Sequence, residues 1–168
     1  MTTWTIAPED VDSADAAALW AAYYTEVSDR WFEREYGPGH STPADELERE
    51  IAAETGADLA PPNGALLIAR YDGEAAGCAG VRLIDVRTAE LKRVFVRKEM
   101  RGKGAGRVLI PAVEDVARAL GAERAVLDTR LDLIEARTLY SRHGYREIPA
   151  YNDGEDNPYA EIWYGKDL

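Results

Sequence analysis

Apolar residues in the first third of the chain repeat at the spacing of helices. Over residues 8–36 they recur every three or four positions, which predicts one helix and a second, shorter helix over residues 30–36. Residues 41–56 begin with Ser, Thr and Pro and end at a glycine, the start and stop signals of a further helix. Ahead of these helices, residues 4–7 predict a short edge strand.

Short apolar runs replace the helical spacing after residue 64. Residues 65–84 form two such runs around Asp72-Gly73, a dipeptide suited to a two-residue hairpin turn. Further strands are predicted over residues 89–96, 124–129, 145–151 and 159–168, and further helices over residues 104–122 and 132–144. This order predicts an α/β (α+β) fold, one sheet of mixed strand direction flanked by helices. The length fits a single domain of residues 1–168.

The chain is acidic, with 20 basic and 31 acidic residues and a formal charge of −11. Such a surface repels a phosphate backbone, which argues against nucleic acid as a partner and favours cationic small molecules. No apolar run reaches the roughly 18 residues of a membrane span, and the N-terminal residues lack a secretion signal. We therefore predict a cytoplasmic protein with no membrane partner. A single cysteine, Cys78, and two histidines argue against a metal site.

Three glycines lie in residues 101–106, "RGKGAG", between a predicted strand and a predicted helix. Unpaired N–H groups at a helix start, together with the helix dipole, favour an anion, and glycine lets the anion approach the backbone. Seven basic residues concentrate between Lys92 and Arg107, opposed only by Glu99. The loop therefore predicts a phosphate site, with a plain strand-to-helix turn as the alternative. Its spacing fits neither a Walker loop nor the dinucleotide fingerprint.

Two motifs carry a resemblance to a known family. The segment "VRKEMRGKGAGRVLI" resembles the coenzyme A loop of the GNAT family of N-acetyltransferases, and the later "LYSRHGY" resembles that family's second signature. The matching residues are Arg101, Gly104 and Gly106 in the first motif and Leu139, Tyr140, Gly144 and Tyr145 in the second. The resemblance covers about residues 65–168. It implies a GNAT-like, mostly antiparallel sheet with splayed central parallel strands, and acetyl-CoA as the donor of an acetyl group to an amine.

The resemblance also assigns residues to the donor. The pantetheine arm would lie along Val94, Phe95 and Val96, where backbone groups help to polarise the thioester carbonyl. The pyrophosphate would rest on the backbone N–H groups of the glycine loop, assisted by its basic side chains. The loop residues are Arg101, Gly102, Lys103, Gly104, Ala105 and Gly106.

The attacking amine must lose a proton, and Glu90 is the candidate base. It stands six residues before the end of the donor strand, where histone-type members of the family carry their glutamate. A surface carboxylate paired with Lys92 or Arg70 is the structural alternative. Asp85, Asp128 or a relay through water could also take the proton.

The departing thiolate needs a proton, and the resemblance places Tyr140 where many relatives have a tyrosine that reaches the sulfur. The alternative is a helix tyrosine with a satisfied hydroxyl. Leu133 stands where relatives often have an asparagine that bonds the coenzyme, so that contact is absent or supplied by another group.

The C-terminal tail points to the acceptor. It resembles a bacterial subset of the family whose tail reads Tyr-Asn, one residue, Asn-Pro-Tyr-Ala, but it carries an extra Gly-Glu-Asp at residues 154–156. Aromatic faces beside carboxylates suit an ammonium group. The candidate acceptor residues are Tyr151, Asn152, Tyr159 and Trp163, and residues 1–64 would form the rest of the acceptor side.

The leading hypothesis is an N-acetyltransferase that acts on a small cationic molecule or an amino acid. Acetylation of a protein lysine or N-terminus is an alternative within the same family. A coenzyme A-binding sensor domain without turnover is an alternative of another class. The sequence leaves open both the identity of the acceptor and whether the chain forms a homodimer.

Overall fold

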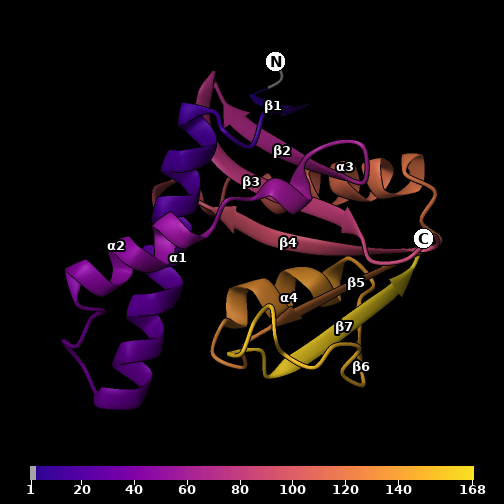
Figure 1. Cartoon of the computed structure of the whole chain (residues 1–168). Coiled ribbons are helices and arrows are strands. Elements are labelled where there is room, and N and C mark those ends of the chain that lie inside the picture. The colour runs from indigo at the N-terminus through magenta and orange to yellow at the C-terminus, as the bar shows by residue number, and fades with distance from the viewer. Residues whose placement is uncertain (1–2) are drawn as a thin grey trace.

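The computed structural model describes residues 3–168 and folds them around a seven-stranded sheet (Figure 1). The strand order is β1-β2-β3-β4-β5-β7-β6, and β4 with β5 forms the parallel pair of an otherwise antiparallel sheet. This architecture confirms the predicted fold. The strands are β1 (Trp4–Pro8), β2 (Gly64–Tyr71), β3 (Glu74–Leu83), β4 (Thr88–Val96), β5 (Arg124–Thr129), β6 (Arg146–Ile148) and β7 (Ile162–Asp167).

Helices cover both faces of this sheet. Leu19 of the first helix clusters with Leu66 and Ile68 of β2, whereas Leu109 of the third helix clusters with Leu67 of the same strand. Because successive side chains of a strand point to opposite faces, these two helices lie on opposite sides of the sheet. Within residues 3–168, no helix is long and apolar enough to cross a membrane. The helices are α1 (Ala14–Tyr36), α2 (Ala44–Ala53), α3 (Ala105–Ala119) and α4 (Ile134–Arg142), with single 3₁₀ turns η1 (Ala57–Leu59) and η2 (Lys98–Met100).

The prediction of two helices within residues 8–36 is wrong, because α1 is continuous. The Ser13 side chain caps its start by accepting a hydrogen bond from the Ala16 N–H at 3.0 Å, and Gly37, with a φ of 100°, ends it. No glycine or proline lies between these caps, so nothing breaks the backbone ladder through the polar middle of the helix. Figure 1 shows the C-terminal part of α1 standing clear of the sheet beside α2.

β4 and β5 separate partway along β4. Their parallel pairing joins only Thr88–Glu90 of β4 to Arg124–Val126 of β5. Against β3, the register of β4 shifts between Cys78 and Gly80. Close to this bulge Arg93 has a φ of 53°, a left-handed backbone that is uncommon for residues other than glycine. The bulge and the lost pairing open the sheet at its centre, as the predicted splay required.

The last two strands are shorter than predicted. Residues 149–161, which we call the tail loop, separate β6 from β7 and contain no helix or strand. This loop crosses the sheet at the place where β4 and β5 part, and its side chains therefore reach both strands.

Candidate active site

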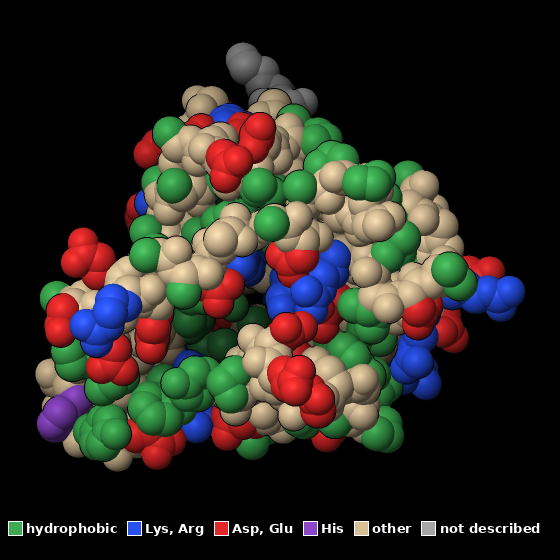
Figure 2. All heavy atoms as spheres, viewed as in Figure 1, with side chains coloured by type: hydrophobic (Ala, Val, Ile, Leu, Met, Phe, Trp, Pro, Cys, Tyr) green, Lys and Arg blue, Asp and Glu red, His purple; other side chains and the backbone are tan. Residues whose placement is uncertain are grey.

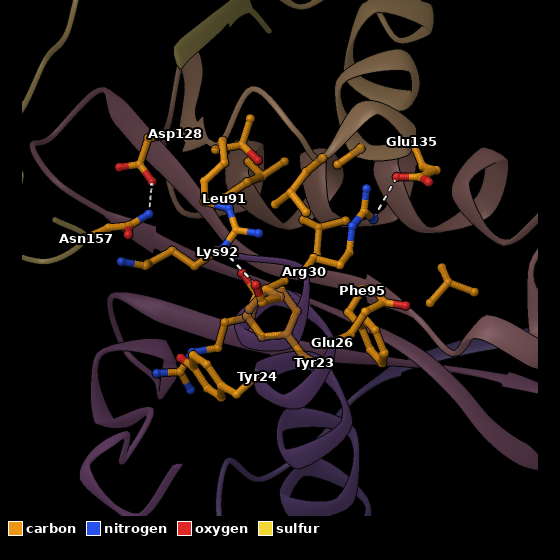
Figure 3. Close-up of a pocket in the computed structure, with 18 of the residues that line it drawn as sticks. Tyr23, Tyr24, Glu26, Arg30, Leu91, Lys92, Phe95, Asp128, Glu135 and Asn157 are labelled. Carbon is orange, nitrogen blue, oxygen red and sulfur yellow. Dashed lines mark hydrogen bonds and ion pairs between the residues drawn. The ribbon is translucent and has the colours of Figure 1, made fainter. Parts of the chain in front are cut away.

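A cleft of about 1970 Å³ starts where β4 and β5 separate and continues beside the C-terminal half of α1. Figure 2 shows its opening as a hollow with acidic, basic and hydrophobic side chains around it. The walls come from α1, α2, β4, the glycine loop, α4 and the tail loop. In the close-up of Figure 3, Tyr23 and Tyr24 of α1 lie among the lining residues with Leu91 and Phe95 of β4. All nine residues assigned to the donor from the sequence line this cleft.

Glycine is needed at the three loop positions for two different structural reasons. Gly102 and Gly104 have φ values of 79° and 84°, which strongly favour glycine, and no atom lies within 4 Å of the position a Cβ would take at either residue. Gly104 is also the N-cap of α3, so free backbone N–H groups and open space meet there. At Gly106, by contrast, a Cβ would lie 2.4 Å from Leu139 Cδ1 of α4. That glycine lets two helices pack closely.

The basic side chains of the loop are directed away from its open centre. Arg101 forms an ion pair with Glu26 of α1 at 2.6 Å, and its Nε donates to the Val96 carbonyl at 3.0 Å. The Lys103 ammonium lies 5.3 Å from the centre of the Tyr71 ring. An anion at this loop would therefore be met chiefly by backbone N–H groups, a geometry that suits a pyrophosphate.

Glu90 is buried at the point where the sheet splays. Its side chain is 3% exposed, and both of its oxygens accept hydrogen bonds. Arg82 Nε donates to Oε1 at 2.9 Å, and the Tyr151 hydroxyl donates to Oε2 at 2.5 Å. Lys92 is more distant, at 3.8 Å, and Arg70 pairs with two acidic residues of the N-terminal segment. The carboxylate lines the cleft, but Arg82 rather than Arg70 is its principal cation.

Arg82 also connects Glu90 with two loops. Its Nη1 lies 2.6 Å from Asp58 in η1, and its Nη2 lies 2.6 Å from Asp156 in the tail loop. This ion pair lowers the pKa of the Asp156 carboxyl. Asp156 belongs to the extra Gly-Glu-Asp of this chain, so one part of the insertion fastens the tail loop to the sheet.

The other two carboxylates considered as bases are held by neighbouring groups. Asp128 of β5 lines the cleft, and its two oxygens accept hydrogen bonds from Asn152 and Asn157, each at 2.9 Å (Figure 3 shows the second bond). Asp85 lies outside the cleft in the turn before β4. There it accepts backbone hydrogen bonds from Arg87 and Thr88, and these bonds lower its pKa.

Tyr140 lies in α4 with its side chain in the core and at the wall of the cleft. The residue is 6% exposed, and its ring packs against those of Tyr145 and Tyr164 at centroid distances of 5.9 Å and 6.1 Å. Burial raises the pKa of the hydroxyl, so the group keeps its proton at neutral pH. A protonated phenol at this wall can act as a proton donor. Leu133, the N-cap of α4, also lines the cleft and provides no side-chain cap.

The four tail residues predicted to contact the acceptor separate into two groups. Tyr159 lines the cleft, and its ring lies 5.5 Å from that of Trp31 in α1. Tyr151, Asn152 and Trp163 are not among the residues that line the cleft within residues 3–168. They form a supporting network instead, in which Trp163 Nε1 donates to Asn152 Oδ1 at 3.1 Å.

The aromatic wall of the cleft was not recognised from the sequence. Tyr23, Tyr24, Trp31, Phe32 and Tyr36 of α1 all line the cleft, although their helical spacing suggested an ordinary core face. The signal available in the sequence was the number of aromatic residues in this one segment. In the structure α1 buries only three residues, none of them among these five. Burial also raises the pKa of Tyr23 to about 12.

The end of the cleft beside α2 is acidic. Glu46, Glu50 and Glu155 line it, and none of them forms an ion pair within residues 3–168. Burial and the nearby Glu46 raise the pKa of Glu50. Glu161 differs, because Arg34 holds it at 2.8 Å. Aromatic faces and unpaired carboxylates thus line the same cleft as the glycine loop.

An open glycine loop at a helix start and a splayed parallel strand pair define a cleft that suits a phosphate-bearing cofactor. Comparisons with known proteins agree. The acetyltransferase (GNAT) family matches residues 20–145. An uncharacterized N-acetyltransferase of Schizosaccharomyces pombe is 34% identical over 106 residues, which cover 62% of this chain and 63% of the relative. An IAA acetyltransferase of Azospirillum brasilense is 33% identical over 90 residues, which cover 53% of this chain and 59% of the relative.

A solved structure extends the likeness over almost the whole chain. It is described as an acyl-CoA N-acyltransferase of Klebsiella pneumoniae and is 26% identical, with a TM-score of 0.71 and coverage of 98% of this chain and 97% of that one. The chain spans about three fifths of the length of the two relatives above. The chain belongs to the acetyltransferase (GNAT) family, whose members use acetyl-CoA as donor. The resemblance inferred from the two motifs is thereby confirmed.

Proposed function

We propose that this chain transfers the acetyl group of acetyl-CoA to the amine of a small cationic molecule or an amino acid. The observation that carries the proposal is the single cleft. It connects the open glycine loop, the splayed β4, Glu90 and Tyr140 with an acidic and aromatic end. The proposal treats residues 1–168 as one domain, in which residues 65–168 bind the donor and residues 1–64 form most of the acceptor side.

The donor is placed by backbone groups. N–H groups of residues 101–106 hold the pyrophosphate at the start of α3, and the open space beside Gly102 and Gly104 leaves room for it. The pantetheine arm follows β4 along Val94 and Val96, past the bulge, where the pairing with β5 has ended. Acetyl-CoA supplies the thioester, and backbone N–H groups of β4 stabilise the charge that develops on its carbonyl oxygen.

Two side chains move the protons. Glu90, oriented by Arg82 and Tyr151, accepts the proton of the acceptor ammonium, directly or through a water molecule. The amine nitrogen then bonds to the acetyl carbon and releases its second proton as the carbon–sulfur bond breaks. Tyr140 stays protonated at neutral pH because burial raises its pKa, and it donates this proton to the departing sulfur. The proton that the nitrogen releases then returns to the Tyr140 oxygen.

The acceptor lies at the acidic end, beside α2 and the tail loop. Unpaired carboxylates of Glu50 and Glu155 attract a cation, and the faces of Trp31 and Tyr159 add cation–π attraction of about 0.5–2 kcal/mol. The relative named IAA acetyltransferase supports a small-molecule acceptor. Tyr151, Asn152 and Trp163 contribute by holding the tail loop in place.

The test is consumption of acetyl-CoA, followed by release of free thiol, with separate pools of amines, amino acids and basic peptides. Turnover with a small-amine or amino-acid pool supports the proposal. Turnover confined to peptides would instead assign a protein as the acceptor. Binding of acetyl-CoA without turnover in any pool would leave a coenzyme A sensor.

Electrostatic recruitment can be tested once an acceptor is known. Glu155→Gln removes a carboxylate that lines the cleft without an ion pair, and we expect it to raise the KM of the acceptor at low salt and much less at high salt. Glu147→Gln, on exposed β6 away from the cleft, is the matched control and leaves the KM unchanged. Equal KM values for both variants at every salt concentration would contradict recruitment by the tail loop.

A further inference from the structure

The cleft is lined by two arginines that have no ion-pair or hydrogen-bond partner within residues 3–168. Nine lysines and arginines line the cleft, and six of them form ion pairs with acidic residues. Of the other three, Lys103 lies over the Tyr71 ring. Arg107 and Arg142 make neither an ion pair nor a side-chain hydrogen bond within residues 3–168. Both are exposed.

These two arginines belong to helices that touch. A Cβ at Gly106 of α3 would lie 2.4 Å from Leu139 Cδ1 of α4, so the helices meet at that pair. Arg107 follows Gly106 directly, and Arg142 comes three residues, less than one helical turn, after Leu139. Both residues therefore lie close to this helix contact, near the N-terminus of α3, and both line the cleft.

The phosphate groups of coenzyme A offer a ligand for these two unpaired arginines. Coenzyme A carries a pyrophosphate and, at the far end of the molecule, a ribose 3′-phosphate. The pyrophosphate is met by the backbone N–H groups of the glycine loop, since the Arg101 side chain is held by Glu26. A second phosphate has no backbone cradle of that kind, and guanidinium groups bind phosphate oxygens in a bidentate geometry.

We propose that Arg107 and Arg142 bind the 3′-phosphate of the donor at the crossing of α3 and α4. The inference rests on the proposed function, because it requires coenzyme A at the glycine loop. It adds a specificity: the protein distinguishes coenzyme A from its 3′-dephospho form. The selectivity weakens as salt rises, because both side chains are exposed.

The experiment is calorimetric titration of coenzyme A and of 3′-dephospho-coenzyme A into the wild-type chain, Arg107→Ala, Arg142→Ala and the double variant. The wild-type chain should prefer coenzyme A by about tenfold or more, because hydrogen bonds to charged groups are involved. Each variant should lose roughly tenfold in affinity for coenzyme A and stay within about twofold for the dephospho form. The double variant should bind both ligands equally.

Arg118→Ala is the matched control, because Arg118 lies on α3 away from the cleft and pairs with Asp115. It should change neither affinity. Equal loss for both ligands in the arginine variants would place these side chains on the pyrophosphate and overturn the inference. A wild-type chain that binds both ligands equally would overturn it and leave the proposed function standing. A wild-type chain that binds neither would remove both.

Discussion

Two neighbouring tyrosines offer a sharp test of the catalytic assignment. Tyr140 and Tyr145 are both buried, at 6% and 3% exposure, and their rings lie 5.9 Å apart. Their hydroxyls differ. That of Tyr145 donates to the buried Glu114 at 2.9 Å, whereas that of Tyr140 has no hydrogen-bond partner within residues 3–168 and belongs to the cleft wall. Removing each hydroxyl should therefore affect a different property.

Tyr140→Phe should lower kcat by about 10²-fold or more, since general acid catalysis contributes 10²- to 10⁴-fold. The KM for acetyl-CoA should change little, and stability should change by less than about 0.5 kcal/mol, because no protein hydrogen bond is lost. Burial raises the pKa of Tyr140, so the phenol stays protonated and the ratio of wild-type to variant rates should be constant from about pH 6 to pH 9.

Tyr145→Phe should show the opposite pattern. It removes a hydrogen bond to a buried carboxylate, a loss of about 1.5–3 kcal/mol, while Lys166 still pairs with Glu114 at 2.8 Å. At about 2–4 °C per kcal/mol for a chain of this size, Tm should fall by roughly 3–12 °C. Turnover of the folded variant should stay at the wild-type level.

Steady-state kinetics and thermal unfolding of both variants, measured on the same preparations, provide the comparison. The reasoning fails if Tyr140→Phe retains more than about a third of the wild-type turnover. It also fails if the two variants lose turnover equally, because the effect would then come from the packing of the aromatic cluster and not from a proton donor.

Three further outcomes are expected. Glu90→Gln should lower the rate most at pH values where the amine is largely protonated, and a pH–rate profile parallel to wild type would point to another base or a water relay. Asp156→Asn should reduce stability at pH 7, measured by urea unfolding, through loss of its ion pair with Arg82. Because that pair lowers the pKa of Asp156, the difference from wild type should begin to shrink at about pH 4 and disappear only below the lowered pKa. Gly106→Ala should lower Tm through its clash with Leu139, and an unchanged Tm would refute the tight crossing of α3 and α4.

The resemblance of one motif to a known family supplied Tyr140 as the candidate proton donor, and the sequence alone determined most of the element types and the glycine loop. These depend on local properties that a short segment carries with it. Periodicity separates helices from strands, and glycine at residues 102 and 104 marks a backbone with positive φ wherever the segment lies. The two motifs lie at the start of α3 and the end of α4, with β5 between the two helices, so their spacing was readable too.

Only the tertiary structure decided which side chains meet. Arg82 faces Glu90 because the register between β3 and β4 places them opposite each other, and a bulge fixes that register. Tyr151 donates a hydrogen bond to Glu90, and Asp156 pairs with Arg82. Both belong to the tail loop, which comes more than sixty residues later in the chain.

The contacts of single glycines and charged side chains were likewise decided only by the tertiary structure. Gly106 belongs to the predicted phosphate loop, and only the structure shows that a Cβ there would lie against Leu139 of another helix. Arg101 was predicted to assist at the pyrophosphate, and only the structure shows that Glu26 of α1 lies within 2.6 Å of its guanidinium group. Hydrogen bonds and ion pairs depend on distances of a few ångströms between residues that are remote in sequence, and those distances exist only after the sheet and its helices have assembled.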